Sequence, residues 1–168
     1  MVATIGLHVY TSTNAGTESG TVTGIDLISA DNATNTLGNR QTYPVVTATN
    51  SFEKHLRLKL EVAPANSISN IKFWTDGSGT ANVLFRGKLA IGTGGATPGT
   101  GDSTPSATTM TADADAYSYT SGSKGTWDSG SYSTINHVTK ALLLQLQPSA
   151  SATPGNWSET LSYSYDEA

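Results

Sequence analysis

The strongest constraint on the fold is an alternation of apolar and charged side chains between Phe52 and Val62. One set of alternate positions is apolar: Phe52, Leu56, Leu58, Leu60 and Val62. The intervening set is charged or polar: Glu53, His55, Arg57, Lys59 and Glu61. A period of two places these sets on opposite faces of a β-strand. We therefore predict a strand with its apolar set in the core and its charged set in water.

The same alternation predicts further strands over 68–75, 82–91, 137–147 and 160–165, with weaker signals over 3–11, 21–29 and 43–49. Turn-forming residues separate them: Leu37-Gly38-Asn39, Pro64-Ala65-Asn66 and Asp76-Gly77-Ser78-Gly79, the last of which predicts a hairpin. About eight strands with long Gly/Ser/Thr-rich loops predict one all-β domain over 1–168, an antiparallel β-sandwich or jelly-roll-like barrel. The two ends, 1–10 and 163–168, become extended arms if the sheets do not hold them.

Composition excludes several classes of function. Only 13% of the residues are charged and the net charge is −4, with nine scattered basic residues that form no stripe for phosphates, so we expect no nucleic-acid binding. The longest apolar run, Ala141 to Leu144, is far shorter than the roughly 20 residues that span a bilayer, and the N-terminus lacks the features of a signal peptide. No cysteine is present to form a disulfide or a thiolate zinc site, which fits synthesis in a reducing cytoplasm.

Residues for catalysis are few and dispersed. The three histidines are His8, His55 and His137, and no Gly-x-Ser-x-Gly motif accompanies them. We expect His55 and His137 to be exposed strand residues. The acidic residues that could form a glycosidase pair are expected to be solvated: Asp113, Asp115, Asp128, Asp166 and Glu167. The sequence therefore predicts a non-enzymatic protein.

No cofactor is predicted. Calcium is the one weighed, because carboxylates and loop oxygens occur at Asp76-Gly77-Ser78-Gly79, Asp113-Ala114-Asp115 and Asp128-Ser129-Gly130. None of the three segments matches an EF-hand or a glycine-rich calcium repeat, so we expect no metal.

Two segments interrupt the strand pattern. Residues 92–106 are low in complexity and predict a mobile loop, so that deletion of Gly94 to Thr104 is expected to leave folding intact. Residues 118–133 are rich in Gly, Ser and Tyr and predict either a contact loop or an ordered surface loop anchored by Trp127. The candidate partner-contact residues are Trp127, Tyr117, Tyr119, Tyr132, Tyr163 and Tyr165.

A resemblance gives the function prediction its direction. The runs that carry it are Ile71 to Gly77, Gly125 to Gly130, Lys140 to Gln147, Ala152 to Gly155 and Leu161 to Glu167. Together they resemble the small β-sandwich virion proteins of tailed bacteriophages. The resemblance implies a capsid decoration (cement) protein or another minor virion component, made in the host cytoplasm. Its implied partners are the major capsid protein and itself, as a homo-oligomer with a trimer favoured; a tail or baseplate component is the variant of this hypothesis.

A carbohydrate-binding module is the alternative from a different class, because it shares the sandwich fold. Its sugar platform would be formed by exposed aromatic residues: Trp74, Trp127, Trp157, Tyr117, Tyr119 and Tyr132. The aromatic share of 8% is ordinary and argues weakly against such a platform.

Overall fold

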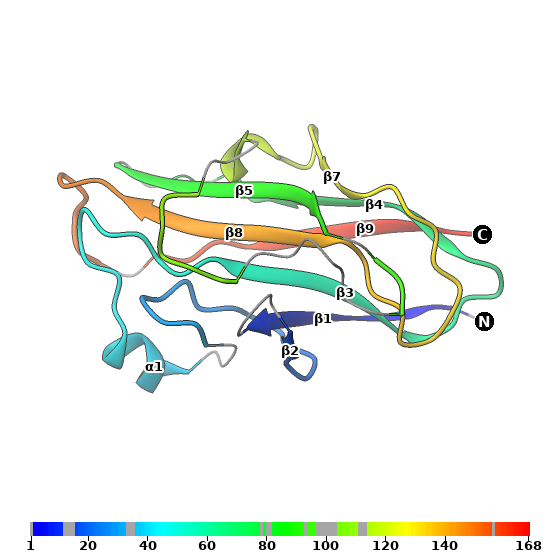
Figure 1. The fold of residues 1–168 in the computed structure, drawn as a ribbon. Coiled ribbons are helices and arrows are strands. Elements are labelled where there is room, and N and C mark those ends of the chain that lie inside the picture. The colour runs from blue at the N-terminus through cyan, green and yellow to red at the C-terminus, as the bar shows by residue number, and fades with distance from the viewer. Residues whose placement is uncertain are drawn as a thin grey trace.

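The computed structural model describes residues 2–11, 16–32, 36–77, 79, 82–92, 94–96, 104–110, 114–155 and 157–168. These residues form two antiparallel sheets packed face to face (Figure 1). The larger sheet contains, in order, β2 (Thr17–Glu18), β1 (Thr4–Thr11), β3 (Lys54–Val62), β8 (Ala141–Pro148), β5 (Val83–Ile91) and β6 (Ala114–Asp115). The smaller contains β7 (Gly125–Asp128), β4 (Ile68–Thr75) and β9 (Leu161–Glu167). The prediction of an all-β antiparallel sandwich is confirmed.

Among the described residues, the helical segments are α1 (Leu37–Thr42) and a 3-10 turn (Ala116–Ser118). The turn predicted at Leu37-Gly38-Asn39 is instead the first part of α1. Thr36 caps it by accepting a hydrogen bond from Asn39 N at 3.2 Å. The helix buries no residue and projects from one end of the sandwich (Figure 1). Within the described part of the chain, no helix is long and apolar enough to cross a membrane.

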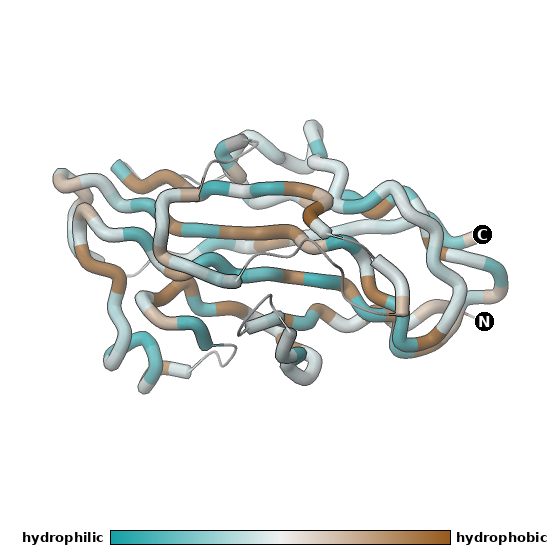
Figure 2. The backbone as a smooth tube through the Cα atoms, in the orientation of Figure 1, coloured by the Kyte–Doolittle hydropathy of each residue, from teal (hydrophilic) through white to brown (hydrophobic). Residues whose placement is uncertain are grey.

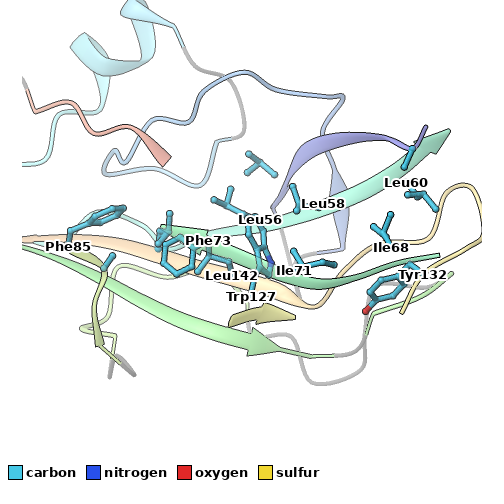
Figure 3. Close-up of a cluster of buried hydrophobic side chains, with 14 residues drawn as sticks. Leu56, Leu58, Leu60, Ile68, Ile71, Phe73, Phe85, Trp127, Tyr132 and Leu142 are labelled. Atoms are coloured by element: carbon cyan, nitrogen blue, oxygen red, sulfur yellow. The ribbon is translucent and has the colours of Figure 1, made fainter. Parts of the chain in front are cut away.

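The core lies between the sheets and is built from the apolar positions of the alternating strands. Figure 3 shows its labelled members, among them Leu56, Leu58, Leu60, Ile71, Phe73 and Trp127. Trp127 is fully buried, with its ring edge-on to Phe73 and to Tyr163 at centroid distances of 6.4 Å. Its Nε1 donates to the Lys140 carbonyl at 3.0 Å, so that burial leaves no polar atom unpaired.

Two of the weaker strand predictions are wrong. Residues 21–29 and 43–49 form no strand, although Val22, Ile25 and Leu27 pack against the core. The main chain of residues 21–29 bonds to the main chain of the described sheet at a single point, from Val22 N to the Leu7 carbonyl at 2.8 Å, and the Tyr43 carbonyl accepts from Ser29 N at 3.0 Å. The alternation therefore identified side chains that pack against the core. Such packing by single side chains does not require a hydrogen-bonded strand ladder.

The hairpin predicted at Asp76-Gly77-Ser78-Gly79 is also wrong. β4 lies in the smaller sheet and β5 in the larger, so the connection crosses from one sheet to the other. Gly77 adopts a φ of 79°, a left-handed conformation that favours glycine, and Ser78 lies outside the described residues. Since Phe73 and Phe85 both belong to the buried core, the two strands face each other across it instead of sharing a ladder.

Most of the charged face of β3 does not face water as the alternation suggested; of this set, Lys59 and Glu61 remain partly exposed. His55 and Arg57 are fully buried and Glu53 is 9% exposed, which corrects the prediction that His55 is exposed. Coil segments cover this outer face: Glu53 N donates to the Ser106 carbonyl at 2.9 Å, and Met110 N donates to Gln145 Oε1 at 2.9 Å. The central strands β3 and β8 are thus largely buried on both faces.

The buried outer face forms a polar layer: His8, Tyr10, Glu53, His55, Arg57 and Gln145. The register pairs Tyr10 with His55 and His8 with Arg57, which places all four on one side of the sheet. The Arg57 guanidinium lies 5.6 Å from the centre of the Tyr10 ring, and its Nη1 donates to the Thr139 carbonyl at 2.5 Å. These contacts compensate part of the cost of burying the charge.

Both segments considered as extended arms are held in the sheets. Residues 4–11 form β1, and most of 163–168 belongs to β9. The ends also bind each other, because Ala3 N donates to both carboxylate oxygens of Glu167, at 3.0 and 3.1 Å. Strand pairing satisfies the main-chain groups that a free arm would expose to solvent.

The predicted mobile loop at 92–106 falls partly on residues 93 and 97–103, which lie outside the described residues. The flanking residues are anchored. Gly95 and Val138 exchange two main-chain hydrogen bonds of 2.8 and 2.9 Å, and the Ser106 carbonyl accepts from Glu53 N. Deletion of Gly94 to Thr104 would remove the Gly95–Val138 pair, and its effect on folding stays a prediction.

The register of β3 gives a direct test. Leu58 is 1% exposed, so Leu58→Asp places an unpaired carboxylate in the core. We expect loss of the folded state, because the penalty of several kcal/mol is comparable to a typical total stability of about 5–15 kcal/mol. Lys59→Asp breaks the half-exposed pair with Glu18 (2.7 Å) and should cost about 1 kcal/mol. Urea unfolding followed by circular dichroism measures both, and equal effects would contradict the assigned faces.

Candidate functional site

The core opens into an apolar groove of about 510 Å³ at the end of the sandwich where β8 ends and β5 begins. Residues 44–47 form one wall, and residues 152–155 with Trp157 form the other. Val83, Leu146 and Pro148 lie between them. None of the lining residues is charged, so the groove is suited to an apolar occupant.

The first wall is fixed by bonds to the end of β8. Ser51 N donates to the Leu146 carbonyl at 2.9 Å, and Leu146 N donates to Ser51 Oγ at 3.0 Å. Upstream, Thr49 N donates to the Val46 carbonyl at 3.2 Å around Ala48, whose φ is 60°. This tight turn leaves Val46 57% exposed, and Figure 2 shows an apolar stretch in the segment between α1 and β3.

The second wall is fixed by an aromatic triad. The Trp157 ring packs on Phe85 with centroids 5.0 Å apart, and Tyr117 packs on the same ring at 5.6 Å. Trp157 Nε1 donates to the Tyr117 hydroxyl oxygen at 2.5 Å. Because the triad joins β5, the 3-10 turn and the segment before β9, this wall is preformed.

A pair of carboxyl groups, Glu159 and Asp76, lies where the segment after Trp157 meets the end of β4. Glu159 accepts from Asp76 N at 3.0 Å through Oε1, while its buried Oε2 has no hydrogen-bond partner among the described residues. Burial, followed by a side-chain hydrogen bond with Asp76 and repulsion from it, raises the pKa of Glu159 to about 7. The charge of Glu159 therefore changes near neutral pH.

A second, polar cavity of about 390 Å³ lies on the outer face of the larger sheet. It is lined by Glu53, Lys88, Thr104, Ser106, Thr108, Thr109, Met110 and Leu143. His55 is buried nearby, with Nε2 3.5 Å from Glu53 Oε2 and, within the described part of the chain, no hydrogen-bond partner at either ring nitrogen. Nucleophilic catalysis needs a hydroxyl or thiol bonded to such a base, and His55 makes no such bond.

Two of the candidate partner-contact residues are core residues. Trp127 is fully buried and Tyr132 is 8% exposed. The Tyr132 hydroxyl donates to Asp128 Oδ2 at 2.6 Å, and the buried Asp128 also accepts from Gly130 N at 2.7 Å and Lys140 N at 2.6 Å. The interpretation of Trp127 and Tyr132 as partner contacts is wrong for the folded chain, because both rings fill the core of the sandwich.

The other four candidates are partly exposed. Tyr117 lies within the 3-10 turn and Tyr119 follows it, while Tyr163 and Tyr165 lie in β9; all four pack against the core. The structure does not gather the six aromatic residues into one surface. Their role as contacts stays a prediction for these four.

The acidic residues considered for calcium or glycosidase chemistry are also dispersed. Asp128 is used inside the core, and Asp115 caps the 3-10 turn by accepting from Tyr117 N at 3.2 Å. Asp113 lies outside the described residues. Among the residues that the structure describes, no three His, Asp or Glu side chains come together as a group that could hold a metal ion.

The sequence reasoning missed Lys54, which occupies an apolar position of β3 and is 1% exposed. Its Nζ donates to the carbonyls of Ala30 (3.1 Å) and Asn32 (2.6 Å), which ties the coil before α1 to the sheet. Burial lowers its pKa from 10.5 to about 8, against the attraction of Asp31 and Asp26. A lysine among leucines of the same parity was the signal that could have revealed it.

Searches against protein-family models, curated proteins and solved structures found no match to this chain.

The buried ammonium of Lys54 predicts a pH effect on stability. Between pH 8 and about 10 the unfolded chain keeps a proton that the native state has lost, so stability rises with pH by up to about 3 kcal/mol. Lys54→Met removes this titration. We expect the free energy of unfolding of the wild type, measured relative to that of Lys54→Met, to increase across this window. A constant difference between the two proteins would contradict a depressed pKa.

Proposed function

We propose that this chain is a non-enzymatic virion structural protein, specifically a capsid decoration protein that stabilises a bacteriophage shell by binding the major capsid protein. The observation that carries the proposal is the uncharged apolar groove, because exposed apolar concavities of this kind are typical of protein-binding surfaces. The phage setting comes from the resemblance of the sequence runs described above.

The proposed occupant is a projecting apolar segment of the major capsid protein. The groove is lined by Pro44, Pro148 and Pro154 together with Val46 and Trp157. Because none of its lining residues is charged, the occupant needs no opposite charge. An aromatic ring flanked by prolines is a rigid surface that loses little conformational entropy on binding. A protein that acts only by adding binding energy to a shell needs this pre-organisation and no chemistry.

The arrangement of the aromatic residues favours assembly over carbohydrate binding. A sugar platform needs aromatic faces open to solvent, yet Trp127 and Tyr132 lie in the core and Trp157 is packed on Phe85. Trp74 is partly exposed, and the Lys124 ammonium lies 4.1 Å from the centre of its ring. No row of open rings remains among these candidates.

The location on a particle is tested by quantitative mass spectrometry of virus particles purified from the source of this chain. A decoration protein is expected at hundreds of copies per particle, in a fixed ratio to the major capsid protein. A handful of copies would replace the decoration proposal with a neck, tail or baseplate role. Absence from the particles would overturn the virion proposal, and a polysaccharide pull-down would then test the carbohydrate alternative.

The groove itself is tested by Val46→Asp. Val46 is 57% exposed, so folding should be retained, while a carboxylate buried against the apolar occupant should lower particle binding by at least about tenfold. Ile135→Asp is the matched control, because Ile135 is 51% exposed and lies in the loop before β8, outside the groove. Co-sedimentation with purified particles measures both variants, and equal binding by the two would contradict docking through the groove.

A further inference from the structure

We infer that β9 is a self-association edge, which pairs antiparallel with β9 of a second copy of this chain. This inference uses a surface separate from the groove and does not depend on the identity of the shell partner. It rests on three observations: the length of the open edge, the distribution of charge along it, and the exposure of its tyrosines.

β9 differs from the other edges of the two sheets. β2 and β6 contain two residues each and β7 contains four. β1 is accompanied along its outer side by residues 19–22, through bonds such as Ser19 N to the Val9 carbonyl at 2.9 Å. β9 contains seven residues and pairs with β4 alone; toward its other side, no main-chain hydrogen bond joins it to the described residues. Such an edge is a template for another strand.

The side chains of β9 do little to block pairing. The strand contains no proline and no lysine, and its first five residues are uncharged. Tyr163 and Tyr165 belong to the core-facing set but remain partly exposed. A second strand on this edge would bury both rings and supply partners for the free main-chain groups.

The charge pattern selects one register. A twofold axis at Ser164 places Tyr163 opposite the second copy's Tyr165, while the acidic Asp166 and Glu167 face the second copy's uncharged Ser162 and Leu161. All seven residues then pair, with two tyrosine–tyrosine pairs and no like charges directly opposite. Parallel pairing in register would instead align Asp166 with its own copy, which is destabilising.

The resulting assembly is a dimer with a continuous sheet. The order becomes β7-β4-β9 of one copy followed by β9-β4-β7 of the other, so each three-stranded sheet gains the partner strand that it lacks. A closed twofold contact of this kind favours a dimer over the trimer expected from the sequence.

The register is tested with single cysteines, since the chain contains none of its own. In Ser164→Cys the two Cα atoms would lie about 4.5–5.5 Å apart across the axis, within disulfide reach. In the matched control Ser162→Cys, on the same face of β9, the two cysteines would be about 13 Å apart. We expect mild oxidation of the purified full chain to convert most of Ser164→Cys, and little of Ser162→Cys, to covalent dimer on non-reducing gels.

Charge substitutions test the same register without a covalent bond. Ser164→Lys sets two lysines opposite each other and should weaken the dimer roughly threefold or more, whereas Ser162→Lys meets the second copy's Asp166 and should tighten it by a similar factor. Analytical ultracentrifugation measures both dissociation constants. A wild type that stays monomeric at millimolar concentration, equal cross-linking of the two cysteine variants, or shifts of the same sign for the two lysine variants would overturn the proposal. None of these outcomes bears on particle binding through the groove.

Discussion

Burial of both faces of β3 and β8, the central strands of the larger sheet, is the constraint on which the rest of the structure depends. β3 presents Leu56, Leu58 and Leu60 to the core and His55 and Arg57 to a covered polar layer. An arginine buried in this way needs hydrogen-bond acceptors and an aromatic neighbour, which Thr139 and Tyr10 supply. The coil segments over these strands are bonded to them or to their flanks: residues 104–110 to Glu53 and to Gln145 of β8, and residues 136–140 to Leu58 and Leu60 of β3.

The strands that form long ladders could be predicted from the sequence, but the coil segments that cover them could not. β4 matches its predicted bounds, and β1, β3 and β5 differ from theirs by one or two residues, because period-two alternation reports one buried face directly. The same pattern says nothing of a coil that crosses the other face. His55 was therefore assigned to water, since a charged parity is exposed in most antiparallel strands and only the tertiary structure reveals the exception.

The candidate site was less predictable than the fold for a related reason. The walls of the groove, at residues 44–47 and at residues 152–155 with Trp157, are about a hundred positions apart, and neither contains a motif. Several of the aromatic residues proposed as contacts pack in or against the core, as large apolar side chains usually do. Trp127 and Tyr132 lie in the core, and Trp157 packs on Phe85 at its margin. Only a local exception, Lys54 among leucines, carried a signal in the sequence that pointed to a special position.

The unequal width of the sheets explains why one edge remains open. Three strands cannot cover the inner face of six, and the uncovered part is filled by coil from which Val22, Ile25 and Leu27 reach the core. Coil can bury apolar area in this way, but it cannot continue the ladder beyond β9, because its main-chain bonds run to the larger sheet, as from Val22 to Leu7. Among the described residues, no strand pairs with the outer side of β9, so its main-chain groups there face solvent or another strand. The unequal width of the two sheets thus leaves open the edge at which we infer self-association, without any residue selected for chemistry.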